Sequence, residues 1–124
     1  MKIDFVKNSV SRLFLLIAFF YFLSCQAAFS VEKQFDELVL DLTSSFPEIR
    51  VDAAWALGEL GDQRAVEHLV KALRDPDECT RYCVVKALKN LGDKRAIPEL
   101  EKALTQEIKP WIVQAIKEAI EELK

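Results

Sequence analysis

Apolar residues recur three and four positions apart over most of the chain beyond residue 31. Residues at this spacing lie on one face of an α-helix, whereas a half-buried strand alternates apolar and polar residues. The alternating pattern is absent from the sequence, and glycine occurs only three times. We therefore predict an all-α fold. The apolar faces are formed by Phe35, Leu38, Val39 and Leu42, by Val51, Ala54, Leu57 and Leu60, and by Val66, Leu69, Val70 and Leu73.

Helix-breaking residues separate these faces. Gly61 follows the second face at the position where a left-handed residue ends a helix. Asp75 and Glu78 have the spacing of a capping box, with Pro76 at the first helical position. Pro110 opens a last helix that reaches about Leu123. The pattern also predicts helices near residues 33–44, 77–91 and 95–104.

An internal repeat organises these helices into pairs. Residues 50–62 read RVDAAWALGELGD, and residues 81–93 read RYCVVKALKNLGD at a constant offset of 31. Adding 31 again aligns Val113, Ala115, Ile116 and Ala119 with Tyr82, Val84, Val85 and Leu88. One helix pair cannot bury its apolar face alone, so such units stack. We predict a short α-solenoid of antiparallel helix pairs, with about two and a half units.

The repeated segments resemble HEAT repeats, in particular the short HEAT-like repeat of phycobilin lyases. In both copies a single arginine near the helix start, Arg50 or Arg81, leads to Ala-Leu and then to Leu-Gly-Asp-x-Arg-Ala, and the resemblance covers about residues 46–123. It implies an α-solenoid in which the second helix of each unit lines the concave surface. It is weak evidence of function, because one fold serves many functions.

The first thirty residues have a different composition. Lys2, Lys7 and Arg12 precede the apolar run LFLLIAFFYFL at residues 13–23, and small or polar residues follow up to Ser30. This order is typical of a secretory signal peptide. An uncleaved membrane anchor and a lipoprotein site at Cys25 are alternatives. We expect a signal or anchor at 1–30, a capping helix at 31–45 and a repeat domain at 46–124, exported to the periplasm or held at the outer face of the inner membrane.

Charge excludes some partners. The chain has 17 basic and 20 acidic residues, and removing Lys2, Lys7, Arg12 and Asp4 with the leader leaves 14 and 19, a net charge of −5. The two signs are interspersed, so neither nucleic acid nor an anionic lipid surface is an expected partner. Contact with a membrane is expected only through an uncleaved leader.

Candidate chemistry is sparse. Cys79 and Cys83, four residues apart, could form a disulfide in an oxidising compartment or remain reduced, and with His68 they offer too few ligands for zinc. His68 has no nucleophile beside it in any motif and is expected to be solvated. We therefore expect neither catalysis nor a cofactor nor a metal site.

Repeated charges favour structural roles. Arg50 and Arg81 can bond to neighbouring loops as a ladder, and Asp62 and Asp93 can cap helices. Trp55 stands where the next unit has a lysine, and it either packs under the capping helix, which we favour, or is an exposed anchor.

The expected function is binding of a protein partner by a non-catalytic scaffold. The candidate surface on the second helices consists of Glu67, His68, Lys71, Glu99 and Lys102. A second candidate is the last helix, where Trp111, Ile112 and Ile120 could bind a partner or a second copy, because no later helix covers them. A subunit of a lyase related to phycobilin lyases and a membrane-tethered accessory are the alternative functions.

Overall fold

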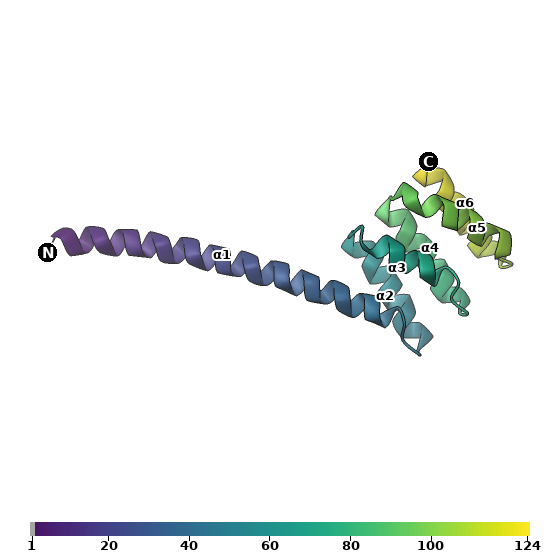
Figure 1. The fold of residues 1–124 in the computed structure, drawn as a ribbon, viewed down its shortest axis with the longest axis horizontal. Coiled ribbons are helices and arrows are strands. Elements are labelled where there is room, and N and C mark those ends of the chain that lie inside the picture. Colours follow the sequence, from purple (N-terminus) through teal and green to yellow (C-terminus); the bar gives the residue numbers. More distant parts are fainter. Residues whose placement is uncertain (1) are drawn as a thin grey trace. The chain divides into compact units, whose positions relative to one another are not determined.

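The computed structural model describes the backbone of residues 2–124 and the side chains of residues 12–25 and 34–124. It divides into two units, Met1–Gln34 and Phe35–Lys124. Helix α1 (Lys2–Asp41) belongs to both units (Figure 1). The second unit contains α2 (Pro47–Leu60), α3 (Ala65–Ala72), α4 (Glu78–Leu91), the 3₁₀ helix η1 (Lys94–Ala96), α5 (Ile97–Gln106) and α6 (Pro110–Leu123). The prediction of an all-helical chain is confirmed for residues 2–124.

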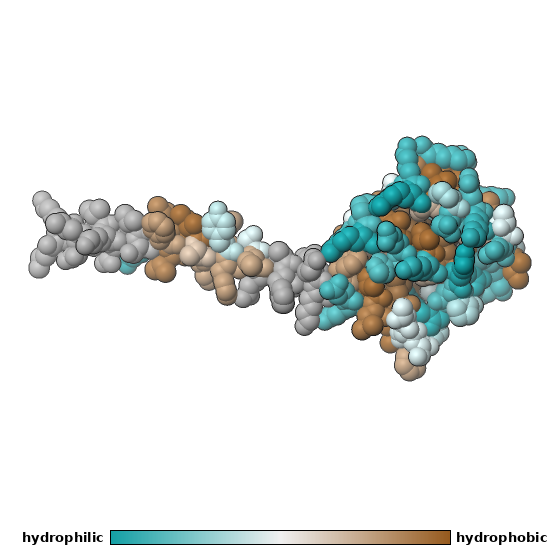
Figure 2. Space-filling view, viewed as in Figure 1, coloured by the Kyte–Doolittle hydropathy of each residue, from teal (hydrophilic) through white to brown (hydrophobic). Residues whose placement is uncertain are grey.

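The first unit is a single helical segment with an apolar middle. The large apolar side chains between Leu13 and Leu23 are exposed, and Figure 2 shows them as a brown band. No helix in the described part of the chain is both long enough and apolar enough to span a membrane. The side chains of Lys2 and Lys7, and those of the expected cleavage region at 26–30, lie outside the described residues.

The second unit is a two-row stack of helices. In each repeated pair we call the helix that comes first in the chain the first helix and the other the second helix. The first helices α2, α4 and α6 form one row, in which α2 contacts α4 and α4 contacts α6. The second helices α3 and α5 form the other row (Figure 1). Each turn from a first helix into the second is made by a glycine, Gly61 with φ 71° and Gly92 with φ 68°. Only glycine adopts this left-handed conformation without steric cost, so the predicted helix ends are confirmed.

The neighbouring first helices α2 and α4 approach each other closely through small residues. A Cβ atom placed on Gly58 of α2 would lie 2.8 Å from the Ala87 Cα of α4. Around this contact Leu57, Leu69 and Leu88 are fully buried. A larger residue at position 58 would push the two helices apart, so the stack depends on this glycine and on the small residue opposite it.

The cap of α4 differs from the prediction. Its N-cap is Asp77, whose Oδ2 accepts a hydrogen bond from the Thr80 backbone N at 2.7 Å. This bond holds the pKa of Asp77 below its usual value. Asp75 is not the cap, because its carboxylate accepts two hydrogen bonds from Arg50 of the preceding unit. The capping box of Asp75 and Glu78 was therefore a wrong assignment.

The repeat spacing is not constant. The N-caps Phe46 and Asp77 are 31 residues apart, but Asp77 and Lys109 are 32 apart. The extra residue lies in the loop between α5 and α6, so the predicted alignment of the last helix was off by one. With the corrected spacing, Ile116 and Ile120 take the places of Val84 and Leu88, and all four are buried.

The end of α1 occupies the place of a second helix. Phe35, Leu38 and Leu42 stand 31 residues before Val66, Leu69 and Leu73. Phe35 and Leu42 are buried in the same core as α3, and Leu38 packs against it. The stack therefore begins with a second helix and ends with a first helix.

The predicted arginine ladder is present. Arg50 donates two hydrogen bonds to Asp75 and a third, from Nη1, to the Ser44 carbonyl at 2.8 Å. Arg81 repeats this with Glu107, at 2.7 Å for Nε to Oε2, and with the Asp75 carbonyl at 2.9 Å. Each arginine thus ties the loop before its own helix to the loop of the next unit. The ladder ends at α6, where Val113 takes the arginine's place.

Replacing Leu88 with alanine should lower the free energy of unfolding by about 2–5 kcal/mol, because Leu88 is fully buried between the helix rows. Urea denaturation followed by circular dichroism measures the change. The exposed Leu40 provides a control, since Leu40→Ala removes little packing. A loss below about 0.5 kcal/mol for Leu88→Ala would contradict the packing described here.

Acid should weaken the ladder. The hydrogen bonds from Arg81 hold the pKa of Glu107 below its ordinary 4.5. The unfolded chain therefore takes up this proton first as pH falls, so the stabilisation is complete above about pH 5 and is lost below that pH. Glu107→Gln should cost about 1.5–3 kcal/mol at pH 7 and flatten the decline of stability between pH 5 and pH 3. Glu101→Gln, at an exposed site, is the control, and a parallel decline in both variants would contradict the role of Glu107.

Candidate protein-binding surface

The second helices carry most of the predicted contact residues. Lys71 of α3 and Lys102 of α5 are exposed, while His68 and Glu99 are half-buried. His68 and Lys71 line one groove, and Glu99 and Lys102 line another. We call the two grooves and α3 between them the second-helix surface. Glu67 is exposed but lines neither groove; its charge acts instead on Arg95 of the following unit.

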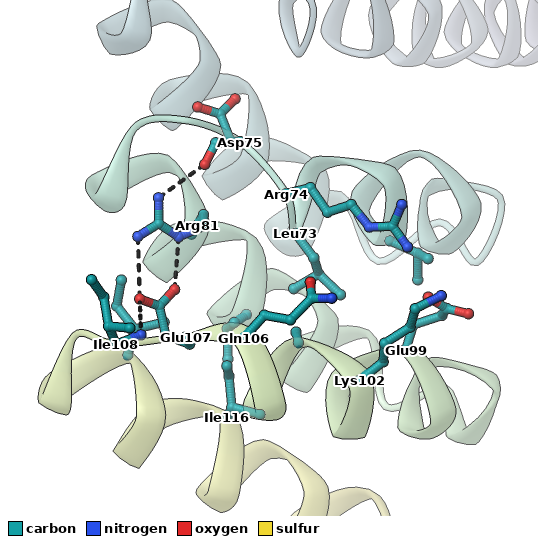
Figure 3. A pocket seen from close by; sticks show the side chains of 14 residues that line it. Leu73, Arg74, Asp75, Arg81, Glu99, Lys102, Gln106, Glu107, Ile108 and Ile116 are labelled. Atoms are coloured by element: carbon teal, nitrogen blue, oxygen red, sulfur yellow. Dashed lines mark hydrogen bonds and ion pairs between the residues drawn. The ribbon is translucent and has the colours of Figure 1, made fainter.

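The larger groove has a volume of about 410 Å³. Its apolar lining comes from α3, α4, α5 and α6, and is formed by Val70, Leu73, Val85, Ala103, Ile108, Ile112 and Ile116. Figure 3 shows Arg81 and Glu107 paired at one end and Arg74, Glu99 and Lys102 toward the other. The groove therefore combines an apolar floor with charges of both signs at its rim.

The charges at the paired end of this groove are held in place. Hydrogen bonding to Glu107 raises the pKa of Arg81, and the same bonds lower the pKa of Glu107. The Glu107 Oε1 also accepts a hydrogen bond from the Lys109 backbone N at 3.0 Å. Both groups stay ionised near neutral pH and already bind each other. The rim residues Arg74, Glu99 and Lys102 are the better candidates for contact with a ligand.

The smaller groove, of about 280 Å³, lies between the end of α1 and α3. It shares Arg74 and Asp75 with the larger groove, so these two residues stand between them. His68 is at its edge, where the imidazole meets the Phe35 ring edge-on with centroids 6.2 Å apart. His68, which was expected to be solvated, is half-buried by this contact. Arg74 was missed because its position in the next unit is a threonine and no repeat marks it.

The last helix does not form the expected apolar patch. Ile112 and Ile120 are 0% and 6% exposed, because the extra loop residue turns this face of α6 onto α4 and α5. Only Trp111 remains half-exposed, with the Lys109 Nζ 5.3 Å from its ring centroid. The outward face is polar and consists of Gln114, Lys117, Glu118 and Glu121. This helix closes the stack, and Ile120 belongs to the core.

Trp55 is exposed rather than buried. Its side chain is 55% exposed, although packing under the first helix was the favoured prediction. The corresponding residues of the next two units are Lys86 and Glu118, which lie 3.9 Å apart on the outer side of the stack. The polar residues at the corresponding positions therefore indicated correctly that position 55 is exposed, and the favoured prediction of burial was wrong.

The two cysteines of the Phe35–Lys124 unit lie on α4. Cys79 and Cys83 are free thiols on successive turns of α4, and burial raises the pKa of Cys83, which makes it a weak nucleophile. No group of three or more potential metal ligands occurs among the described residues.

Asp62 and Asp93 form local hydrogen bonds. Asp62 Oδ1 accepts a hydrogen bond from the Arg64 backbone N, and Asp93 Oδ1 accepts one from the Arg95 backbone N, both at 2.9 Å. Each carboxylate also pairs with the side chain of that arginine, and these bonds lower its pKa. The interpretation as a helix cap is confirmed for Asp93, which is the N-cap of η1, whereas Asp62 binds within the turn before α3, whose N-cap is Arg64.

Comparison with known proteins agrees with this architecture. The family model described as HEAT repeats matches residues 35–121, which is well over half of the chain. The match begins at the end of α1, where the stack begins. No curated protein matches the chain. The chain belongs to the HEAT repeat family.

Proposed function

We propose that this chain is a non-catalytic protein-binding module that uses the second-helix surface. HEAT repeats commonly serve as scaffolds for protein interaction, and the two adjacent grooves are the observation that supports the same role here. Their apolar floors can accept side chains of a partner, and the charges at their rims can orient its backbone and polar groups.

The partner's chemistry follows from the groove. An apolar side chain would cover Leu73 and Val85, and an acidic group beside it would meet Arg74 and Lys102. Glu99 at the same rim would accept a donor from the partner. The surface therefore suits a short peptide segment with one apolar anchor and charges of both signs. Its rim charges are solvated, so we expect modest affinity and sensitivity to salt.

We also propose that the chain is exported. The basic leader, the apolar run at residues 13–23 and the small residues after it support a secretory signal, with a retained anchor as the alternative. The features shared with phycobilin lyases are repeat residues such as Leu57 and Leu88 in the core and Gly61 and Gly92 in the turns. They concern the fold, so we propose no role in a lyase.

A photo-crosslinking residue at Lys71 or Lys102 should form the same adduct with a partner protein in the native compartment. The same residue at Lys117, an exposed lysine on the closed end, is the matched control and should form none. The double variant Lys71→Glu/Lys102→Glu should reduce recovery of that partner about tenfold, through like-charge repulsion. Equal adducts at all three positions would remove the support for this surface.

The intact mass of the protein purified from its native compartment tests export. Cleavage should remove the leader near residues 24–30 and leave the repeat domain. A mass that includes the whole leader would support the anchor instead, and an added acyl mass on Cys25 would support the lipoprotein alternative. Recovery of the uncleaved protein in the cytoplasm alone would contradict export.

A further inference from the structure

One apolar stripe is buried in two of the three first helices and open in the other. Counted from the N-caps, the stripe has the same positions in each helix. In α4 it is Thr80, Val84, Ala87 and Leu91, and in α6 it is Ile112, Ile116, Ala119 and Leu123, all 6% exposed or less. In α2 the same positions are Ile49, which is 38% exposed, Ala53, which is buried, and Ala56 and Leu60, which are half-buried.

We call this stripe of α2, together with the neighbouring Phe46, the open face. Phe46 is 64% exposed, so two large apolar side chains meet solvent at the start of the helix. Figure 2 shows brown, apolar surface in the region where Figure 1 places the end of α1 and the start of α2. The open face is distinct from the second-helix surface, whose grooves are lined by none of its residues.

The stack itself shows what kind of element covers this stripe. In α4 the stripe is covered by α2, through the close approach of Gly58 to Ala87. In α6 it is covered by α4. The occupant that fits α2 is therefore another helix of the first type.

No helix of the Phe35–Lys124 unit supplies that element. At the equivalent of Gly61 and Gly92, one repeat earlier, stands Ser30, and the backbone of α1 stays helical through it. A second copy is not suited to this role either. The outward face of α6 has Lys117 and Glu121 where α2 has Ala54 and Gly58, so the end of one copy is too polar and too bulky for close packing.

Charge indicates the chemistry of the occupant. Glu48, Asp52 and Glu59 are exposed on α2, and the one basic residue of this helix, Arg50, is bound to Asp75. Where α4 covers α6, Lys89 Nζ lies 3.0 Å from Glu122 Oε1. Glu59 and Glu122 each lie 13 residues beyond their N-caps, Phe46 and Lys109. Glu59 is therefore placed to accept a basic side chain from a helix on the open face, and two acidic faces of this chain would repel each other.

We propose that the open face binds a basic amphipathic helix of a partner protein, which takes the place of the missing first helix. Its apolar residues pack on Ile49 and Leu60, and a lysine or arginine pairs with Glu59. Helices bind grooves and faces of this kind through apolar residues at positions i, i+3, i+4 and i+7.

A peptide with the sequence of α4 is the probe, because α4 covers the equivalent stripe of α6. It spans residues 78–91, has serine in place of Cys79 and Cys83, and is stapled across the positions of Thr80 and Val84, which lie on its other face. Fluorescence anisotropy should show that the peptide binds to the full-length protein. The affinity of the peptide for the Ile49→Asp or Phe46→Asp variant should be at least about tenfold lower. Trp111→Asp, at a residue of α6 that is 50% exposed and lines neither groove, is the matched control and should bind normally.

A charge exchange makes the test specific. Changing the peptide lysines that correspond to Lys86 and Lys89 to glutamate should weaken binding about tenfold, and Glu59→Lys in the protein should restore most of it. Circular dichroism confirms that each variant is folded. The proposal is overturned if Ile49→Asp and Phe46→Asp leave peptide binding unchanged, or if Glu59→Lys does not restore binding of the glutamate-substituted peptide.

Two further outcomes would overturn the proposed occupant. In the first, sedimentation shows a dimer that Ile49→Asp converts to a monomer, in which case a second copy covers the face. Alternatively, the peptide binds only after the leader is removed, in which case the chain covers its own face. Neither outcome affects the proposed role of the second-helix surface, whose crosslinking test uses other residues.

Discussion

The burial of one stripe of α4 by α2, and of the same stripe of α6 by α4, is the constraint on which the stack depends. The stripe can be buried only if the two helices come close, and Gly58 against Ala87 shows how close they come. Each of the three stripes has an alanine at its third position and a leucine at its fourth. Because the contact is between neighbours only, the stack must have two ends, and each end needs its own solution.

The two ends have different solutions. At α6 the outward positions are filled by Lys117 and Glu121, so water can cover that face. At α2 the open face keeps the apolar residues Ile49 and Leu60, whose contact with water is unfavourable. An end that is polar needs no partner, whereas an end that keeps its packing residues remains able to extend the stack.

The arginine ladder positions the larger groove as well as stabilising the loops. Arg81 joins the loop at Asp75 to Glu107 at the start of the next loop, and both acids line the groove. The groove therefore gets its shape from the same bonds that fix the spacing of the units. A partner bound there would contact side chains that the stack has already ordered, so little conformational entropy is lost on binding.

The sequence by itself determined the helix pairs, the glycine turns, the arginine ladder and the aspartate cap Asp93, because each depends on neighbours along the chain or on an exact repeat. It also placed Lys71 and Lys102 on the second helices correctly. Only the tertiary structure decided which faces are covered. One extra loop residue buried Ile120, and the exposure of Trp55 and the place of Phe35 in the stack depended on contacts between helices. Burial is a property of what lies beside a residue in space, and periodicity along the chain reports only which residues share a face.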